Sequence, residues 1–208
     1  MDVRNLAHKL AGGLAAMRLD LPAGAQEKLL AYLDLLAKWN RTYNLTAVRD
    51  PEDMVSRHLL DSLAALPFVQ GQSLADLGSG AGLPGIPLAI ARPDIAVTLV
   101  ESNGKKARFL REAIRSLPLA NVTVAQGRVQ DATGAFDTVT ARAFASLPDM
   151  LAWGGHLLAW NGRWLALKGH ADPAELDAAT SGFRLVAVHA LDVPGTDGER
   201  CVVELARA

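Results

Sequence analysis

Ser73-Leu-Ala-Asp-Leu-Gly-Ser-Gly-Ala-Gly-Leu-Pro-Gly-Ile-Pro-Leu88 is the stretch that decides the fold of this chain. Its first part, residues 74–77, is a short apolar run that is typical of a buried parallel strand. A loop rich in glycine follows, and residues 86–91 form a second apolar segment that predicts a helix. A glycine turn between a strand and a helix leaves backbone N–H groups at the positive end of a helix dipole. The stretch therefore predicts a nucleotide-binding corner.

Strands and helices alternate after this corner, which indicates a parallel sheet covered by helices. Further strands are expected at residues 96–101, 122–125, 136–141 and 163–167, separated by helices at 105–117, 147–153 and 172–180. Two β-rich runs, 183–191 and 200–206, predict a hairpin at one edge of the sheet. The predicted fold class is α/β, a doubly wound, Rossmann-like sheet of five parallel strands plus a C-terminal hairpin.

The first part of the chain carries helical periodicity and no strand pattern. Apolar residues recur at helical spacing in residues 3–18 and 22–40. Asp50-Pro51 then reads as a cap and first turn of a further helix, which Pro67 ends. We therefore expect an N-terminal helical cap at residues 1–70 and a ligand-binding core at residues 71–208.

Composition limits the class of protein. The chain has 208 residues, of which 50% are hydrophobic and 21% charged, as in ordinary soluble globular proteins. A formal net charge of −1 supplies no general attraction to nucleic acid, so such binding needs a local basic patch. A single cysteine, Cys201, excludes a disulfide framework and a cysteine-rich metal site. With neither a secretory signal nor a membrane-spanning run, the cytoplasm is the expected location, without a membrane partner.

Two kinds of nucleotide fit the glycine loop. Gly80-Ala-Gly-Leu-Pro-Gly85 matches the dinucleotide fingerprint G-x-G-x-x-G, which keeps NAD as an alternative. Against NAD, the Asp76 carboxylate would repel a pyrophosphate, and Pro84 lacks an N–H that a phosphate cradle would use. S-adenosylmethionine fits better, because Asp76 can pair with its ammonium group and its sulfonium is cationic. Glu101, at the end of the second strand, suits the ribose hydroxyls of either ligand.

Asp76-Leu-Gly-Ser-Gly-Ala-Gly82 resembles motif I of the class I S-adenosylmethionine-dependent methyltransferases. Further segments resemble the RsmG (GidB) family, namely Leu83-Pro-Gly-Ile-Pro87, Lys38-Trp-Asn-Arg-Thr-Tyr-Asn-Leu-Thr46, His58-Leu-Leu-Asp-Ser-Leu63, Arg142-Ala-Phe-Ala-Ser-Leu147 and Ala166-Leu-Lys-Gly169. Together these segments cover nearly the whole chain. The resemblance implies a class I methyltransferase that uses S-adenosylmethionine to methylate N7 of a specific guanine in bacterial 16S ribosomal RNA.

The same resemblance implies which residues bind the cofactor. Gly78 and Leu83 match loop positions that contact it, and Val129-Gln130 matches the segment that holds the adenine. Gln130 departs from the glutamate that many members carry, although its amide oxygen can still accept a bond from the adenine amine. The expected cofactor-binding residues are Asp76, Gly78, Ser79, Gly80, Leu83, Glu101, Arg128, Val129, Gln130 and Arg142.

Arg142 follows the fourth strand and is the one candidate for a catalytic residue. Strand ends in this architecture face the ligand crevice, so its guanidinium is expected there. It either donates to the guanine or anchors the carboxylate of the cofactor. The second role, or a position shared by both ligands, is favoured, because a cation aimed at N7 would oppose the positive charge that develops there.

The residues that other methylations need are missing. Attack by carbon 5 of a pyrimidine requires a cysteine nucleophile, whereas Cys201 lies in a terminal strand. The Asn-Pro-Pro-aromatic segment of adenine amino methyltransferases is replaced by Ala141-Arg-Ala-Phe144. Guanine N7 has an exposed lone pair and no proton to lose, so it needs no general base. The residues present are therefore consistent with N7 methylation.

Basic residues predict where RNA is contacted. The helix after Glu101 carries a stripe that either contacts phosphates or is an ordinary solvated face. This stripe is Lys105, Lys106, Arg108, Arg111 and Arg115. Lys168 after the fifth strand and Arg200 near the hairpin are further candidates. The histidines lack metal-ligand pairing, so no metal is expected, and a structural hydrogen bond is favoured for His58, which shares a helix with Asp61.

The expected partner is 16S ribosomal RNA within the small subunit or an assembly intermediate, since a nearly neutral protein binds naked RNA weakly. Two alternatives stay open. One is a class I methyltransferase that acts on another RNA site or on a small molecule. The other is a nucleotide-binding regulator, linked to NAD or a similar ligand, without transferase activity.

Overall fold

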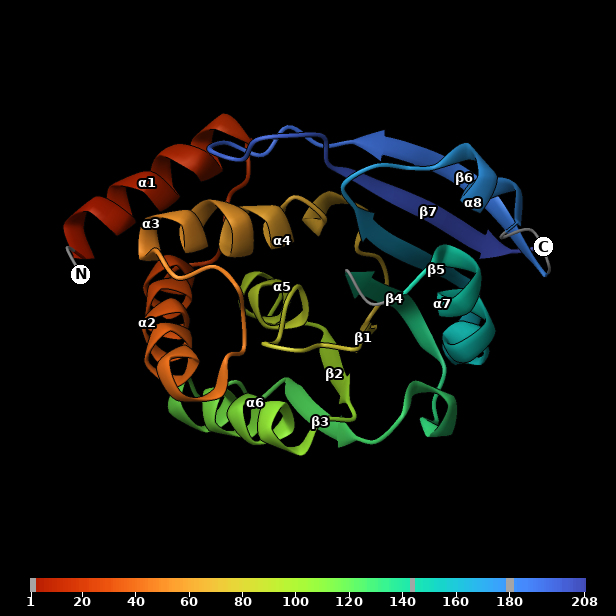
Figure 1. Cartoon of the computed structure of the whole chain (residues 1–208), viewed down its shortest axis with the longest axis horizontal. Helices are drawn as coiled ribbons and strands as arrows, with labels where there is room; N and C mark the ends of the chain where they lie inside the picture. Colours follow the sequence, from red (N-terminus) through yellow and green to blue (C-terminus); the bar gives the residue numbers. More distant parts are fainter. Residues whose placement is uncertain (1–2, 143–144, 179–181) are drawn as a thin grey trace.

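The computed structural model describes residues 3–142, 145–178 and 182–208. A seven-stranded sheet forms its centre, in the order β3-β2-β1-β4-β5-β7-β6 (Figure 1). The strands are β1 (Ser73–Leu77), β2 (Ala96–Glu101), β3 (Val122–Gln126), β4 (Phe136–Arg142), β5 (Leu158–Lys168), β6 (Phe183–Ala190) and β7 (Cys201–Arg207). β1 to β5 are parallel, whereas β7 is antiparallel to both β5 and β6. The predicted sheet and its terminal hairpin are confirmed, with β7 next to β5 and β6 at the edge.

β5 begins at Leu158, earlier than the predicted start at residue 163. Leu158 pairs with Phe136 of β4, and the register shifts before Thr138. Gly162 lies in this irregular part, where a Cβ would stand 2.9 Å from the Asp137 carbonyl oxygen. Only glycine lets the two backbones approach so closely, and that glycine interrupts the apolar pattern from which a strand is predicted.

Helices cover both faces of the sheet, as predicted for a doubly wound fold (Figure 1). α5 (Gly85–Ala91) and α6 (Gly104–Ser116) pack on one face with the N-terminal helices, and α7 (Leu147–Gly154) and α8 (Pro173–Ala178) on the other. Each face buries its own core, with Phe109 in the first and Trp164 in the second. Strands buried on both faces need nearly continuous apolar sequences, and for that reason the sequence predicts most of them.

The N-terminal part is helical, as predicted. It consists of α1 (Val3–Ala16), α2 (Ala25–Tyr43), α3 (Pro51–Met54), the π-helical turn η1 (Val55–Leu60) and α4 (Asp61–Leu63). Short turns η2 (Leu66–Phe68), η3 (Val129–Asp131) and η4 (Gly155–Leu157) occur further along the chain. α2 begins after the predicted residue 22, because Gly24 has a left-handed backbone at φ 77°.

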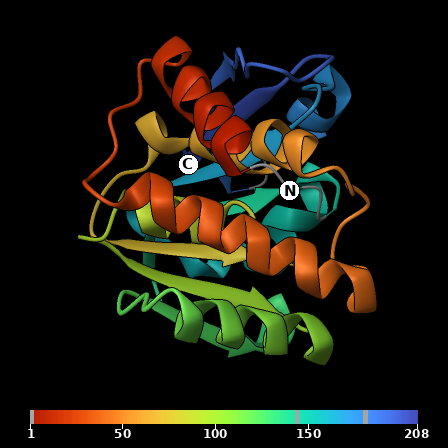
Figure 2. The same ribbon diagram turned by 90° about the vertical axis from the view of Figure 1, so that its left-hand side faces the viewer.

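The N-terminal helices share a hydrophobic core with the sheet. Leu10 and Leu33 belong to the same buried cluster as Ile86 and Phe109, and Figure 2 shows α2, in orange, lying across this face. The division of the chain into domains at residue 70 stays a prediction.

Candidate active site

The strand order reverses at β1, which has β2 on one side and β4 on the other. Doubly wound sheets bind their ligands at such a point, outside the carboxyl ends of the strands. The glycine loop after β1, Glu101 at the end of β2 and Arg142 at the end of β4 all lie there.

The glycine loop is held in shape by its own backbone. Gly78, Gly80 and Gly82 have φ values of 65°, 59° and 89°, in the left-handed region that glycine adopts without strain. The Ser79 hydroxyl donates to the Asp76 carbonyl at 2.8 Å. The N–H groups of Gly82 and Leu83 donate to the Ser79 carbonyl at 2.7 and 3.1 Å. Since the side chains of Ser79 and Leu83 are buried, these positions offer backbone atoms to a ligand.

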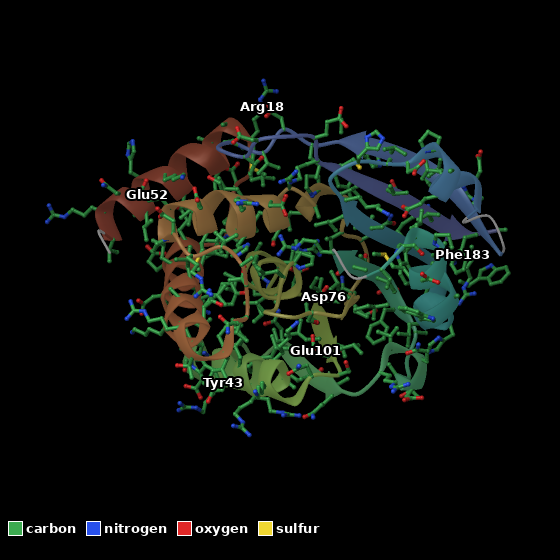
Figure 3. All side chains as sticks on the ribbon, in the orientation of Figure 1. Arg18, Tyr43, Glu52, Asp76, Glu101 and Phe183 are labelled. Atoms are coloured by element: carbon green, nitrogen blue, oxygen red, sulfur yellow. The ribbon has the colours of Figure 1, made fainter. Side chains whose placement is uncertain are left out.

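Asp76 is fully buried beneath this loop (Figure 3). Its carboxylate accepts hydrogen bonds from the Gly85 N–H at 3.1 Å and from the Thr140 hydroxyl at 3.2 Å. Burial raises the pKa of Asp76 to about 7, although these hydrogen bonds act in the opposite direction. The side chain therefore joins β1 to β4 and to the start of α5, and its contact with a ligand ammonium group stays a prediction.

Glu101 lies beside the loop with its carboxylate buried. It accepts hydrogen bonds from the N–H of Gly80 at 2.8 Å and from the N–H of Asn103 at 2.7 Å. A Cβ on Gly80 would meet nothing closer than 3.7 Å beyond its chain neighbours, and one on Gly127 nothing within 4 Å. Open backbone beside a carboxylate suits a ligand with hydroxyl and ammonium donors, so these residues fit S-adenosylmethionine.

The segment after β3 adjoins Glu101, because the Gly127 N–H donates to the Glu101 carbonyl at 3.1 Å. Val129 is buried in the second core, whereas Arg128 and Gln130 are exposed. The structure thus brings the predicted cofactor residues to one edge of the sheet. The atoms that each of them offers to the cofactor stay a prediction.

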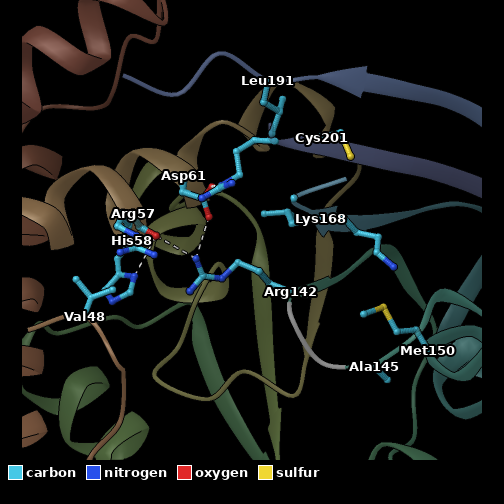
Figure 4. A pocket seen from close by; sticks show the side chains of 13 residues that line it. Val48, Arg57, His58, Asp61, Arg142, Ala145, Met150, Lys168, Leu191 and Cys201 are labelled. Atoms are coloured by element: carbon cyan, nitrogen blue, oxygen red, sulfur yellow. Dashed lines mark hydrogen bonds and ion pairs between the residues drawn. The ribbon is translucent and has the colours of Figure 1, made fainter. Parts of the chain in front are cut away.

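Arg142 extends from the end of β4 toward the N-terminal helices (Figure 4). Its Nη1 donates to Asp61 Oδ2 at 2.9 Å and to the Arg57 carbonyl at 3.2 Å. Its positive charge lowers the pKa of Asp76, against the effect of burial. It also lowers the pKa of His58, in the same direction as burial. The two hydrogen bonds hold the guanidinium against η1 and the start of α4.

A pocket of about 380 Å³ opens beside Arg142 (Figure 4). It is lined by Val48, Arg57, His58, Asp61, Arg142, Ala145, Met150, Leu167, Lys168, Gly169, Leu191, Arg200 and Cys201. The basic side chains among them outnumber the single acidic one, Asp61. A chain with a net charge of −1 thus concentrates positive charge at this pocket.

Two predicted RNA-binding residues, Lys168 and Arg200, line this pocket, and both have acidic partners. The Arg200 Nε lies 3.2 Å from Asp61 Oδ1, and the Lys168 ammonium pairs with Glu175 of α8. Sequence patterns predicted neither Arg57 as part of this site nor Asp61 as an ion-pair partner. The segment His58-Leu-Leu-Asp-Ser-Leu63, which contains Asp61, was the feature of the sequence that could have indicated this part of the site.

None of the predicted basic residues of α6 lines this pocket. Lys105, Arg108, Arg111 and Arg115 are exposed, and Lys106 is half-buried. Arg111 donates to Gln126 at 2.9 Å and Arg115 pairs with Glu112 at 2.7 Å, as on an ordinary solvated helix face. Contact between this stripe and RNA stays a prediction.

Tyr32 of α2 supports the glycine loop, a role that the sequence did not predict. Its hydroxyl donates to the Ala81 carbonyl of the glycine loop at 2.6 Å, and the side chain is fully buried. Burial raises the pKa of Tyr32, so the phenol keeps its proton and the bond. The N-terminal helices therefore support the cofactor loop directly.

His58 is buried and is held by groups other than Asp61. Its Nε2 lies 2.8 Å from the Thr46 hydroxyl, and its Nδ1 lies 3.0 Å from the Arg57 carbonyl. The carbonyl can only accept, so Nδ1 carries the proton and the Thr46 hydroxyl donates to Nε2. Burial lowers the pKa of His58 to about 4, and the charge of Arg142 acts in the same direction.

This pKa predicts that acid weakens the fold through His58. Between pH 6.5 and about 4 the unfolded chain binds a proton at His58 that the folded chain does not. The free energy of unfolding should therefore fall by about 3 kcal/mol more in the parent chain than in a His58→Gln variant across this range. Urea unfolding at a series of pH values measures the difference. Asp76, whose pKa is raised, titrates in the opposite sense, but it is present in both proteins, so its contribution cancels in the difference. Equal pH dependence of the two proteins would contradict the lowered pKa of His58.

Within the residues that the structure describes, no group of three or more His, Cys, Asp or Glu side chains is placed to hold a metal ion. In that same part of the chain, no helix has the length and apolar character that crossing a membrane requires.

Comparison with known proteins identifies the family. The model of the family GidB, rRNA small subunit methyltransferase G, matches residues 25–203. A relative from Xanthomonas campestris pv. campestris (strain 8004), named ribosomal RNA small subunit methyltransferase G, is 57% identical over 93% of this chain and 92% of its own.

Solved structures agree on the fold. The mitomycin 7-O-methyltransferase MmcR gives a TM-score of 0.61 at 18% identity, over 94% of this chain and 75% of that chain. TYW2 from M. jannaschii in complex with AdoMet gives a TM-score of 0.57 at 18% identity, over 72% of this chain and 76% of that chain.

The predicted family, fold class and cofactor are all confirmed. That the glycine loop and Glu101 bind S-adenosylmethionine stays a prediction. The chain belongs to the GidB family and is an S-adenosylmethionine-dependent ribosomal RNA methyltransferase.

Proposed function

We propose that this enzyme methylates N7 of a specific guanine in 16S ribosomal RNA, in the cytoplasm, on the small subunit or an assembly intermediate. The observation that carries the proposal is the position of Arg142. Arg142 ends β4, the strand that pairs with β1 and so adjoins the glycine loop, and its side chain lines the cationic pocket beside Asp61. A methyl donor at that loop and a nucleotide in that pocket would be neighbours, as direct transfer requires.

The chain's own residues align the reactants and keep water out. S-adenosylmethionine, when bound, supplies a methyl group on a cationic sulfur that a lone pair displaces directly. Arg142 is held by Asp61 and the Arg57 carbonyl, and in this proposal its guanidinium separates the two binding regions. Guanine N7 has no proton to lose, so no general base is needed. Both ring nitrogens of His58 already have protein partners, which agrees with that chemistry.

RNA recognition rests on local charge. Phosphate contacts dominate the affinity of proteins for nucleic acid, and here the basic residues at the pocket supply them. The net charge of −1 provides no wider field to hold an unfolded transcript. A folded ribonucleoprotein, which presents the target nucleotide in one geometry, should therefore be the better substrate.

Transfer of a tritiated methyl group tests the function. We expect small subunits or their assembly intermediates to be methylated faster than protein-free 16S transcript, with the label at N7 of one guanine. The modified nucleotide is mapped by digestion and mass spectrometry. Equal rates on the free transcript would contradict the substrate form, and label at another atom or in a small molecule would contradict the assignment.

Calorimetric titration with S-adenosylmethionine and NAD is the matched binding test. We expect S-adenosylmethionine to bind and NAD not to bind.

A further inference from the structure

One carboxylate joins two arginines that are far apart in the chain. Asp61, at the start of α4, binds Arg142 Nη1 through Oδ2 at 2.9 Å and Arg200 Nε through Oδ1 at 3.2 Å. The Asp61 side chain is 11% exposed, against 21% for Arg142 and 26% for Arg200. All three side chains line the pocket of about 380 Å³. Asp61 is thus the innermost of the three, with a guanidinium on each oxygen.

The π-helical turn η1 sets the position of Asp61. The Asp61 N–H donates to the carbonyls of Ser56 and His58, whereas an α-helix would direct it to Arg57. The Arg57 carbonyl accepts instead from Arg142 Nη1. Irregular turns of this kind often occur at functional sites, because they redirect one carbonyl and one side chain. The turn therefore directs two acceptors, the Arg57 carbonyl and the Asp61 carboxylate, to the same guanidinium.

Charge and geometry indicate what this arrangement receives. Two guanidiniums on one carboxylate leave a net positive charge at the pocket, and guanidinium N–H groups match the oxygens of phosphate. Arg200 donates a hydrogen bond from Nη1 to the Glu199 carbonyl and forms an ion pair from Nε to Asp61. Among the described residues its Nη2 has no hydrogen-bond partner. Without the shared carboxylate the two cations would repel each other and separate.

We propose that Asp61 is a positioning residue that fixes Arg200 beside Arg142, so that Arg200 binds an RNA phosphate flanking the target guanine. This inference rests on the proposed function. Arg142 then bounds the cofactor side of the pocket and Arg200 its RNA side. Asp61 itself touches neither ligand and acts only through the two arginines.

Arg200→Gln and Asp61→Asn test the proposal, with Asp53→Asn on the exposed side of α3 as the matched control. Both test variants should raise the KM for small subunits about tenfold, the effect of one lost charge-assisted hydrogen bond. Binding of subunits at several salt concentrations should show a log–log slope that is smaller by about one for each variant. Arg200→Gln should bind S-adenosylmethionine as the parent chain does.

The double variant separates positioning from a purely structural role. If Asp61 fixes Arg200, Asp61→Asn with Arg200→Gln should raise the KM for small subunits no further than Arg200→Gln alone, whereas any effect of Asp61 through Arg142 should be seen in the affinity for S-adenosylmethionine. Additive effects on KM, or an unchanged slope of binding affinity against salt concentration, would overturn the proposal. If Asp61→Asn does not fold, the salt slope of Arg200→Gln alone is the deciding measurement. Failure of the parent chain to methylate subunits would instead count against the proposed function. The salt slopes measure binding and not methyl transfer, so the two failures can be told apart.

Discussion

Replacing Arg142 with alanine is expected to reduce methyl transfer to small subunits by about a hundredfold or more, because the guanidinium that aligns the two reactants in the proposed function is lost. The affinity for S-adenosylmethionine should fall about tenfold if, as we propose, the guanidinium anchors the carboxylate of the cofactor. Tritiated methyl transfer measures the first effect and calorimetric titration the second. The expected loss rests on the proposed role of Arg142, which ends β4 next to β1 and lines the pocket.

Two further variants make this result interpretable. Arg142→Lys keeps the charge but not the planar fork, so it should restore part of the cofactor affinity and little of the transfer rate. Arg184→Ala, on the exposed part of β6, is the control and should behave as the parent chain. Unchanged cofactor affinity with lost transfer would assign Arg142 to orienting the guanine. Unchanged affinity and rate together would remove it from the site.

A Gly85→Ala change should both destabilise the fold and abolish tight cofactor binding. The new Cβ would stand 2.4 Å from Leu99 Cδ2 and 2.7 Å from Asp76 Oδ2. Neither neighbour can yield easily, because Leu99 is in the core and the Asp76 oxygen accepts from the Gly85 N–H. We expect the free energy of unfolding to fall by about 1–3 kcal/mol, as for other overpacked sites. Urea unfolding and titration with S-adenosylmethionine measure both effects.

Gly12→Ala is the matched control for this change. Gly12 lies in α1, and a Cβ there would meet nothing within 4 Å. Alanine should therefore raise the free energy of unfolding by about 0.5–1 kcal/mol through helix propensity, and leave cofactor affinity unchanged. If Gly85→Ala retained the stability and affinity of the parent chain, the close contact between α5 and Asp76 would not support the loop.

The fold was predictable where local sequence and local structure obey the same constraint. A strand covered on both faces needs apolar residues throughout, so β1 and β2 are visible as short runs between turns. The first half of β5 was not predictable from such a run, because it depends on the close approach of the Gly162 backbone to the Asp137 carbonyl. The π-helical turn η1 was also missed, since its helical periodicity looks like that of an ordinary α-helix.

The candidate site divides in the same way. The glycines of the loop, Glu101 and Arg142 were identified from the sequence, because each stands at the carboxyl end of a predicted parallel strand and such ends meet at one edge. The hydrogen bond from Tyr32 to Ala81 and the ion pairs of Asp61 with Arg142 and Arg200 were not identified.

Sequence alone thus determined the sheet, the glycine loop at its carboxyl edge and the family, since periodicity, turn chemistry and motifs act over a few neighbouring residues. The tertiary structure decided which charges face each other across the pocket. Asp61, Arg142 and Arg200 lie on separate segments with no shared local pattern, and they meet only because the N-terminal helices and the sheet bury one common core.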